Sequence, residues 1–164
     1  RDELGDIVLV SPDVGNVKTA NMYAGMLNGE LAIIDKRRKS GTDVESANLI
    51  GDVKNRTVLM VDDMISTAGT ICSAAQLVMD HGAKDVVAAC THPVFVGLAM
   101  ERLKEAPISR IVCTDTIPCG RRTAPIEDKL HELSVDGLIG EAIHRIHHNL
   151  SVSALFASKM NGKR

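Results

Sequence analysis

The sequence predicts an α/β fold, in which an open and mainly parallel sheet of about five strands carries helices on both faces. Short apolar runs alternate with longer segments of helical periodicity along the 164 residues, and this alternation is typical of parallel strands joined by right-handed crossovers. Hydrophobic residues make up 45% of the chain but aromatic residues only 2%, so the core must be aliphatic, as in sheets covered by helices. The length suits a single domain over residues 1–164.

The first predicted strand is the apolar run 7–10, which a Ser-Pro-Asp turn ends. A helix is predicted over 17–27 because small and apolar residues recur on one face, and an Asn-Gly pair then ends it. The apolar run 31–34 predicts the second strand. Residues 36–43 are polar and basic without apolar periodicity, which indicates a mobile loop.

The rest of the chain repeats this alternation. β-branched residues favour strands, and helical spacing of alanine and leucine marks the segments between them. These criteria predict strands over 57–61, 86–90 and 111–114, and helices over 70–82, 95–105 and 137–149. Residues 150–164 form a tail that ends in lysine and arginine.

Composition excludes several classes of function. The net charge of −2 and the scarcity of aromatic residues leave neither a basic surface nor stacking platforms for nucleic acid. The chain has no apolar run of about 18 residues and begins with charged residues, so neither a membrane span nor a signal peptide is predicted. Its four cysteines show no C-x-x-C spacing, which favours reduced thiols over a zinc site. We therefore expect a cytoplasmic protein that binds neither nucleic acid nor a membrane.

A candidate site follows the predicted strand 57–61. Asp62 and Asp63 would stand at its carboxyl end, where ligands bind in open parallel sheets. The run 66–70, Ser-Thr-Ala-Gly-Thr, opens the next helix, and its hydroxyls and amides would hold a phosphate at the positive end of the helix dipole. The carboxylates would accept hydrogen bonds from sugar hydroxyls. Judged on spacing alone, a purely structural explanation fits equally well, with a polar strand end followed by a helix cap. A sugar phosphate, however, would satisfy both parts of the motif.

The run 61–70 resembles the phosphoribosyl-diphosphate-binding motif of the type I phosphoribosyltransferase fold, which several enzymes share. Other motifs narrow the resemblance to the ribose-phosphate pyrophosphokinases, in the same order along the chain. These motifs are 11–15 (SPDVG), 34–38 (IDKRR), 50–53 (IGDV), 61–70 (VDDMISTAGT), 91–95 (THPVF) and 143–156 (IHRIHHNLSVSALF). The resemblance covers about residues 6–156.

This resemblance implies a reaction. The family transfers the diphosphoryl group of ATP to the 1-hydroxyl of ribose 5-phosphate, requires Mg²⁺, and forms homo-oligomers that are hexameric. The expected partners are therefore ATP, ribose 5-phosphate and further copies of the same chain. Family members also carry a second, similar N-terminal domain that supplies much of the ATP site. The resemblance thus implies that this chain corresponds to the C-terminal half and would turn over poorly or not at all alone.

The resemblance also assigns roles to residues. Lys36 and Arg38 match the catalytic basic pair of a flexible loop, and Asp13 matches an aspartate beside the metal. The residues expected to bind ribose 5-phosphate are Asp62, Asp63, Ser66, Thr67, Ala68, Gly69, Thr70 and Arg38. A regulatory site for phosphate or ADP is expected at Ser151, Ser153 and Phe156, although packing of a helix end explains that motif nearly as well.

One residue of the loop departs from the family pattern, because Ser66 stands where an aspartate is usual. Two other functions also stay open, the first because several phosphoribosyltransferases share the loop motif. A base-transferring phosphoribosyltransferase would need a segment that recognises a nucleobase, and the sequence shows no such insert. A non-catalytic regulatory homologue is favoured by Ser66 and the missing half, whereas Lys36 and Arg38 argue against it.

Overall fold

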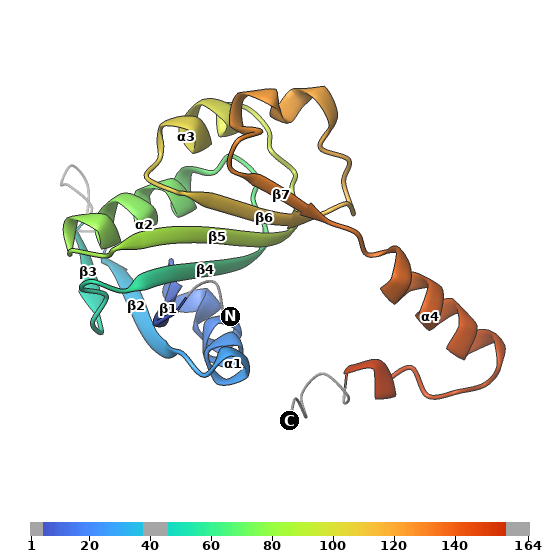
Figure 1. Cartoon of the computed structure of the whole chain (residues 1–164). Helices are drawn as coiled ribbons and strands as arrows, with labels where there is room; N and C mark the ends of the chain where they lie inside the picture. Colours follow the sequence, from blue (N-terminus) through green and yellow to red (C-terminus); the bar gives the residue numbers. More distant parts are fainter. Residues whose placement is uncertain (1–4, 38–45, 157–164) are drawn as a thin grey trace.

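The computed structural model describes residues 5–37 and 46–156. Its centre is a seven-stranded sheet in the order β3-β2-β1-β4-β5-β6-β7 (Figure 1). All neighbouring strands are parallel except β2 and β3, which are antiparallel. The strands are β1 (Ile7–Ser11), β2 (Glu30–Arg37), β3 (Ser46–Ile50), β4 (Thr57–Met64), β5 (Asp85–His92), β6 (Arg110–Thr114) and β7 (Leu130–Leu133). The predicted α/β class with a mainly parallel sheet is confirmed.

The prediction of about five strands was wrong, because it missed β3 and β7. Both are edge strands that pair with only one neighbour, so neither needs the continuous apolar run of a strand buried on both faces. In β7, Leu130 is half-buried and the other three side chains are exposed. In β3, a polar Asn48 interrupts the apolar pattern.

Helices cover both faces of the sheet, as predicted. The helix α1 (Val17–Leu27) lies on one face, and α2 (Gly69–Asp80) and α3 (Ala99–Glu105) lie on the other (Figure 1). The helix predicted over 95–105 begins later because Phe95 and Gly97 both have positive φ angles. Two short 3-10 helices complete this part, η1 (Val14–Asn16) and η2 (Gly120–Ile126).

The central strands are buried on both faces. In β1, Val8 and Val10 face the larger core beneath α2 and α3, whereas Ile7 and Leu9 face the smaller core beneath α1. All five residues of β1 are buried. This double burial fixes the register of β1 and β4, and thereby the position of the loops that follow them.

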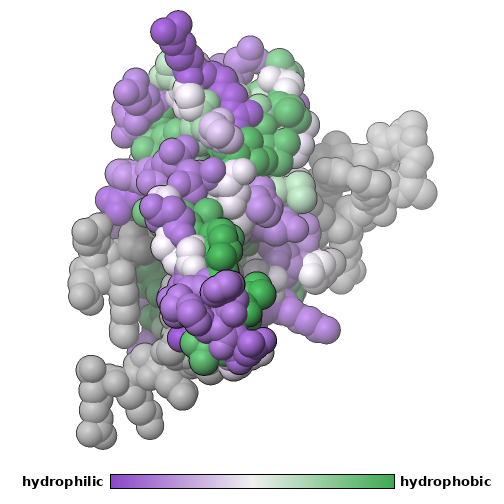
Figure 2. Space-filling model, turned by 90° about the vertical axis from the view of Figure 1, so that its right-hand side faces the viewer, coloured by the Kyte–Doolittle hydropathy of each residue, from purple (hydrophilic) through white to green (hydrophobic). Residues whose placement is uncertain are grey.

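The helix α4 (Asp136–His147) extends away from the sheet (Figure 1). It buries none of its residues, yet one of its faces carries Leu138, Ile139, Ile143 and Ile146, which are all exposed. Figure 2 views the molecule from this end and shows apolar surface among strongly polar side chains. Among the described residues, no helix is long and apolar enough to cross a membrane.

Gly51, which follows β3, is the glycine that we expect to tolerate substitution least. Its φ is +113°, and a Cβ placed on it would lie 2.7 Å from the Cβ of the buried Ala32. Gly51→Ala should therefore lower the free energy of unfolding by about 2–4 kcal/mol, through backbone strain and overpacking.

Urea denaturation measures this free energy, with Gly25→Ala as the control. Gly25 lies inside α1 with open space around it, and alanine there should stabilise the helix by about 0.5–1 kcal/mol. Equal stability of the two variants would contradict the steric argument.

Candidate functional site

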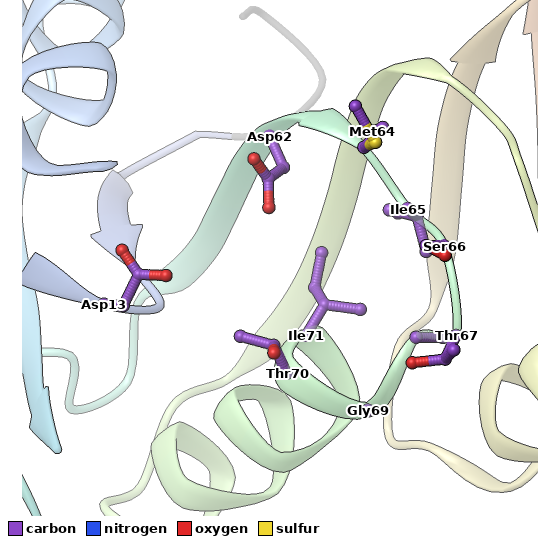
Figure 3. Close-up of a pocket in the computed structure, with 10 residues that line it drawn as sticks. Asp13, Asp62, Met64, Ile65, Ser66, Thr67, Gly69, Thr70 and Ile71 are labelled. Carbon is purple, nitrogen blue, oxygen red and sulfur yellow. The ribbon is translucent and has the colours of Figure 1, made fainter. Parts of the chain in front are cut away.

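The candidate site lies where the parallel neighbours β1 and β4 end. The chain leaves β1 towards β2 on one side and later leaves β4 towards β5 on the other. Such a reversal of strand order opens a crevice beyond the carboxyl ends of the strands. A cavity occupies this place, lined by Asp13, Asp62 and residues 64–71. Figure 3 shows Asp13 and Asp62 on one side of it and the loop 66–69 curving around the other.

The loop that precedes α2 presents its backbone amides to the cavity. The carbonyl oxygens of Ile65 and Ser66 accept hydrogen bonds of 3.0 Å each from the amides of Phe95 and Val96. In a trans peptide the carbonyl and the following N–H point in opposite directions, so the amides of Ser66 and Thr67 point away from the 95–96 segment.

The start of α2 extends this set of unpaired donors. In the described part of the chain, the amides of residues 66–70 donate to no acceptor. The first N–H groups of a helix have no partner within the helix, and no side chain caps α2. Ala68 has a left-handed backbone, with φ of +60°. These amides, together with the positive end of the helix dipole, form a cradle that suits an anion.

Carboxylates form the opposite wall. The Oδ1 atom of Asp62 accepts a hydrogen bond of 2.9 Å from the amide of Asp63, which leaves its second oxygen for a ligand. Burial raises the pKa of Asp62, and the negative charges of Asp63 and Asp13 raise it further. Asp62 lines the same cavity as Asp13, whereas Asp63 lines an adjoining cavity that shares both of these residues. The wall can therefore accept hydrogen bonds from hydroxyls or contribute to a cation site.

Asn16 ties the two loops together. Its side-chain amide donates to the carbonyl oxygen of Val61 at 2.9 Å and to Asp62 Oδ1 at 3.4 Å. Its backbone amide donates to Asp13 Oδ1 at 2.9 Å. Sequence reasoning had not given Asn16 a role, nor Thr19 and Tyr23, which line the adjoining cavity with it. Their spacing of three and four residues places them on one face, and this was the signal that could have found them.

The structure brings together part of the predicted site. Asp13, Asp62 and residues 66–70 line one cavity, and Asp63 lies in the adjoining one. Lys36 belongs to the last part of β2. Because β2 is parallel to β1, its carboxyl end lies at the same end of the sheet as the cavity. Arg38 lies outside the described residues.

The proposed regulatory residues are not part of this cavity. Ser151, Ser153 and Phe156 follow α4, and all three are exposed. Figure 1 places this segment far from the loop before α2. Arg145 of α4 donates to the carbonyl oxygen of Ser151 at 3.1 Å, which fixes the turn after the helix. Their regulatory role stays a prediction.

The carboxylate oxygens of Asp13 and its neighbour Asp62 suit Mg²⁺ only if a substrate supplies further ligands. Within residues 5–37 and 46–156, no group of three or more His, Cys, Asp or Glu side chains could hold a metal ion. Mg²⁺ is commonly bound through one or two carboxylates together with substrate phosphates and water. Asp13 and Asp62 supply such a partial ligand set.

The fold defines a class, the α/β proteins with the type I phosphoribosyltransferase fold. An orotate phosphoribosyltransferase from Aeropyrum pernix shares this fold at a TM-score of 0.51 and 18% identity, over 82% of this chain and 65% of the other. A phosphoribosylpyrophosphate synthetase from Mycobacterium smegmatis matches with a TM-score of 0.80 and 37% identity, over 88% of this chain and 46% of the other.

The sequence narrows the class to one family. The model of the phosphoribosyl synthetase-associated domain matches residues 42–157, and the chain belongs to this family. It is 51% identical to a ribose-phosphate pyrophosphokinase of Caldanaerobacter subterraneus subsp. tengcongensis and 50% identical to one of Rhodopirellula baltica. Each match covers 94% of this chain but 48% of the relative. The predicted resemblance to ribose-phosphate pyrophosphokinases is confirmed, and the chain spans about half the length of these relatives.

Proposed function

We propose that this chain is the ribose 5-phosphate-binding half of a ribose-phosphate diphosphokinase. In this reaction the 1-hydroxyl oxygen of ribose 5-phosphate attacks the β-phosphorus of ATP. The bond from the β-phosphorus to the oxygen shared with the α-phosphorus breaks, AMP leaves with that oxygen, and the hydroxyl proton is lost to a base or to solvent. The observation that carries the proposal is the row of unpaired amides at residues 66–70, which faces the carboxylates at the end of β4.

Each part of this arrangement has a proposed role. The amides and hydroxyls of 66–70 bind the 5-phosphate, and the carboxylates of Asp62 and Asp63 accept hydrogen bonds from the ribose hydroxyls. Ser66 suits this role because an uncharged donor does not repel the phosphate. Lys36 and Arg38 neutralise charge on the diphosphoryl group during transfer.

Mg²⁺ is the proposed cofactor, because carboxylates with substrate oxygens form the environment that it prefers. Asp13 would hold it, directly or through water. When bound, Mg²⁺ would offset the negative charge of the transferred diphosphoryl group.

We also propose that the chain works within a larger assembly in the cytoplasm. The relatives are about twice as long, and the resemblance assigns much of the ATP site to their other half. The exposed apolar face of α4, formed by Leu138, Ile139, Ile143 and Ile146, supports assembly into a homo-oligomer, because a contiguous apolar face on a protein surface is typical of an interface.

Two measurements test the proposal. Calorimetry compares the binding of ribose 5-phosphate and of ribose to this chain, and the phosphate should account for most of the affinity. An AMP-release assay then supplies ATP, Mg²⁺ and ribose 5-phosphate to the chain, alone and with the N-terminal half of the Caldanaerobacter relative. We expect AMP in the second case and little or none in the first. Binding without AMP in either case would contradict the enzymatic role, and absence of binding would contradict the site itself.

A further inference from the structure

Arg102 of α3 contacts the loop that precedes α2, on the side of the loop that faces away from the cavity. Its Nη1 atom donates a hydrogen bond of 2.9 Å to the carbonyl oxygen of Thr67. A Cβ placed on Gly69 would lie 3.3 Å from the same Nη1 atom, so the guanidinium lies close beside the first residue of α2. Arg102 does not line the cavity itself. The loop therefore separates this side chain from the ligand position.

The hydrogen bond from Arg102 fixes the orientation of one peptide group. Because the carbonyl of Thr67 points towards Arg102, the N–H of Ala68 must point the opposite way. That amide is one of the unpaired donors at the cavity. Ala68 also holds a left-handed backbone, with φ of +60°, which is unfavourable for alanine and persists only when neighbouring contacts enforce it.

The charge of Arg102 points to an anionic ligand. A cation beside the N-terminus of a helix is repelled by the positive end of the helix dipole. No acidic side chain in the described part of the chain pairs with Arg102. Two positive elements, Arg102 and the start of α2, thus adjoin one cradle, and a bound phosphate would relieve the repulsion between them.

We propose that Arg102 is a positioning residue for the 5-phosphate of ribose 5-phosphate. It holds the Thr67–Ala68 peptide so that the Ala68 amide faces the phosphate, and it adds positive charge from behind the loop. This inference rests on the proposed function. It extends the site to a residue of α3 that contacts no substrate and lies outside every motif of the resemblance.

The test replaces Arg102 with methionine, which keeps an apolar stem but removes the charge and the donors. Ribose 5-phosphate should bind about 10- to 100-fold more weakly, the range for loss of a charged hydrogen bond. Competition by inorganic phosphate should weaken by the same factor, because both ligands use the same amides. Arg102→Lys keeps the charge and one donor, so it should recover most of the affinity.

Lys104→Met is the matched control, because it removes the same charge from the same helix at an exposed side chain with no contact to the loop. Its affinity for ribose 5-phosphate should equal that of the wild type. An Arg102→Met affinity equal to that of Lys104→Met overturns the inference but leaves the proposed function intact. A loss for ribose 5-phosphate without a loss for inorganic phosphate overturns it as well. If Arg102→Met does not fold, Arg102→Lys and Arg102→Gln decide, because lysine keeps the charge whereas glutamine loses the charge and most of the donors and is shorter. An affinity near that of the wild type for Arg102→Lys with a lower one for Arg102→Gln supports the role, and equal wild-type affinities for both overturn it.

Discussion

Replacing Lys36 with alanine is expected to lower kcat for AMP release by about a thousandfold or more, the range for removing a cation that stabilises phosphoryl transfer. Lys36 belongs to the end of β2, at the same edge of the sheet as the carboxylates and the cradle. In the role proposed for it, its charge acts when negative charge shifts during transfer and not when the 5-phosphate binds. The affinity for ribose 5-phosphate should therefore stay within a factor of about two of the wild type.

The AMP-release assay with the N-terminal half gives kcat, and calorimetry on the chain gives the affinity. Lys84→Ala is the control, because Lys84 is an exposed lysine just before β5, at the opposite edge of the sheet. It should leave both quantities unchanged. A large loss of ribose 5-phosphate affinity in Lys36→Ala would show instead that this lysine binds the phosphate in the ground state.

The local parts of the site could be predicted from the sequence. The apolar run 57–61 followed by two aspartates predicted a buried strand with carboxylates at its end, and β4 has this form. The run 66–70 predicted a phosphate loop at a helix start, and its amides do lie unpaired at a cavity. These features depend on neighbouring residues, whose effects on the backbone are strong enough to read from sequence alone.

The contacts that shape the loops could not be predicted in this way. Asn16 bonds to the carbonyl oxygen of Val61 across 45 positions of sequence, and Arg102 bonds to that of Thr67 across 35. Such side-chain contacts leave no periodic pattern, because each is set by where the fold brings one residue. The edge strands β3 and β7 were not predicted for a related reason, since a strand with a single neighbour can be short and partly polar.

Asp62→Asn should have opposite effects on binding and on stability. The variant keeps an oxygen that can accept from the Asp63 amide but loses the charge that would strengthen the proposed hydrogen bonds from ribose hydroxyls. The affinity for ribose 5-phosphate should fall about 10- to 100-fold. At neutral pH the melting temperature should rise by about 1–3 °C, a modest gain because the group is partly solvated. Asp128→Asn, at an exposed carboxylate, should change neither quantity.

The pH dependence of these effects follows from the raised pKa of Asp62, which burial and the charges of Asp63 and Asp13 produce. A carboxyl whose pKa is higher in the folded state than in the unfolded state stabilises the fold below the unfolded value, about 3.9. This contribution is lost as pH rises through the higher folded value.

The stability gain of Asp62→Asn should therefore be largest at neutral pH and vanish in acid, which thermal unfolding measures. Ribose 5-phosphate affinity should weaken in the wild type as pH falls through the same pKa. The variant should lack this part of the pH dependence of the affinity. A stability difference that is constant with pH would show that the substitution acts through packing and not through the charge of Asp62.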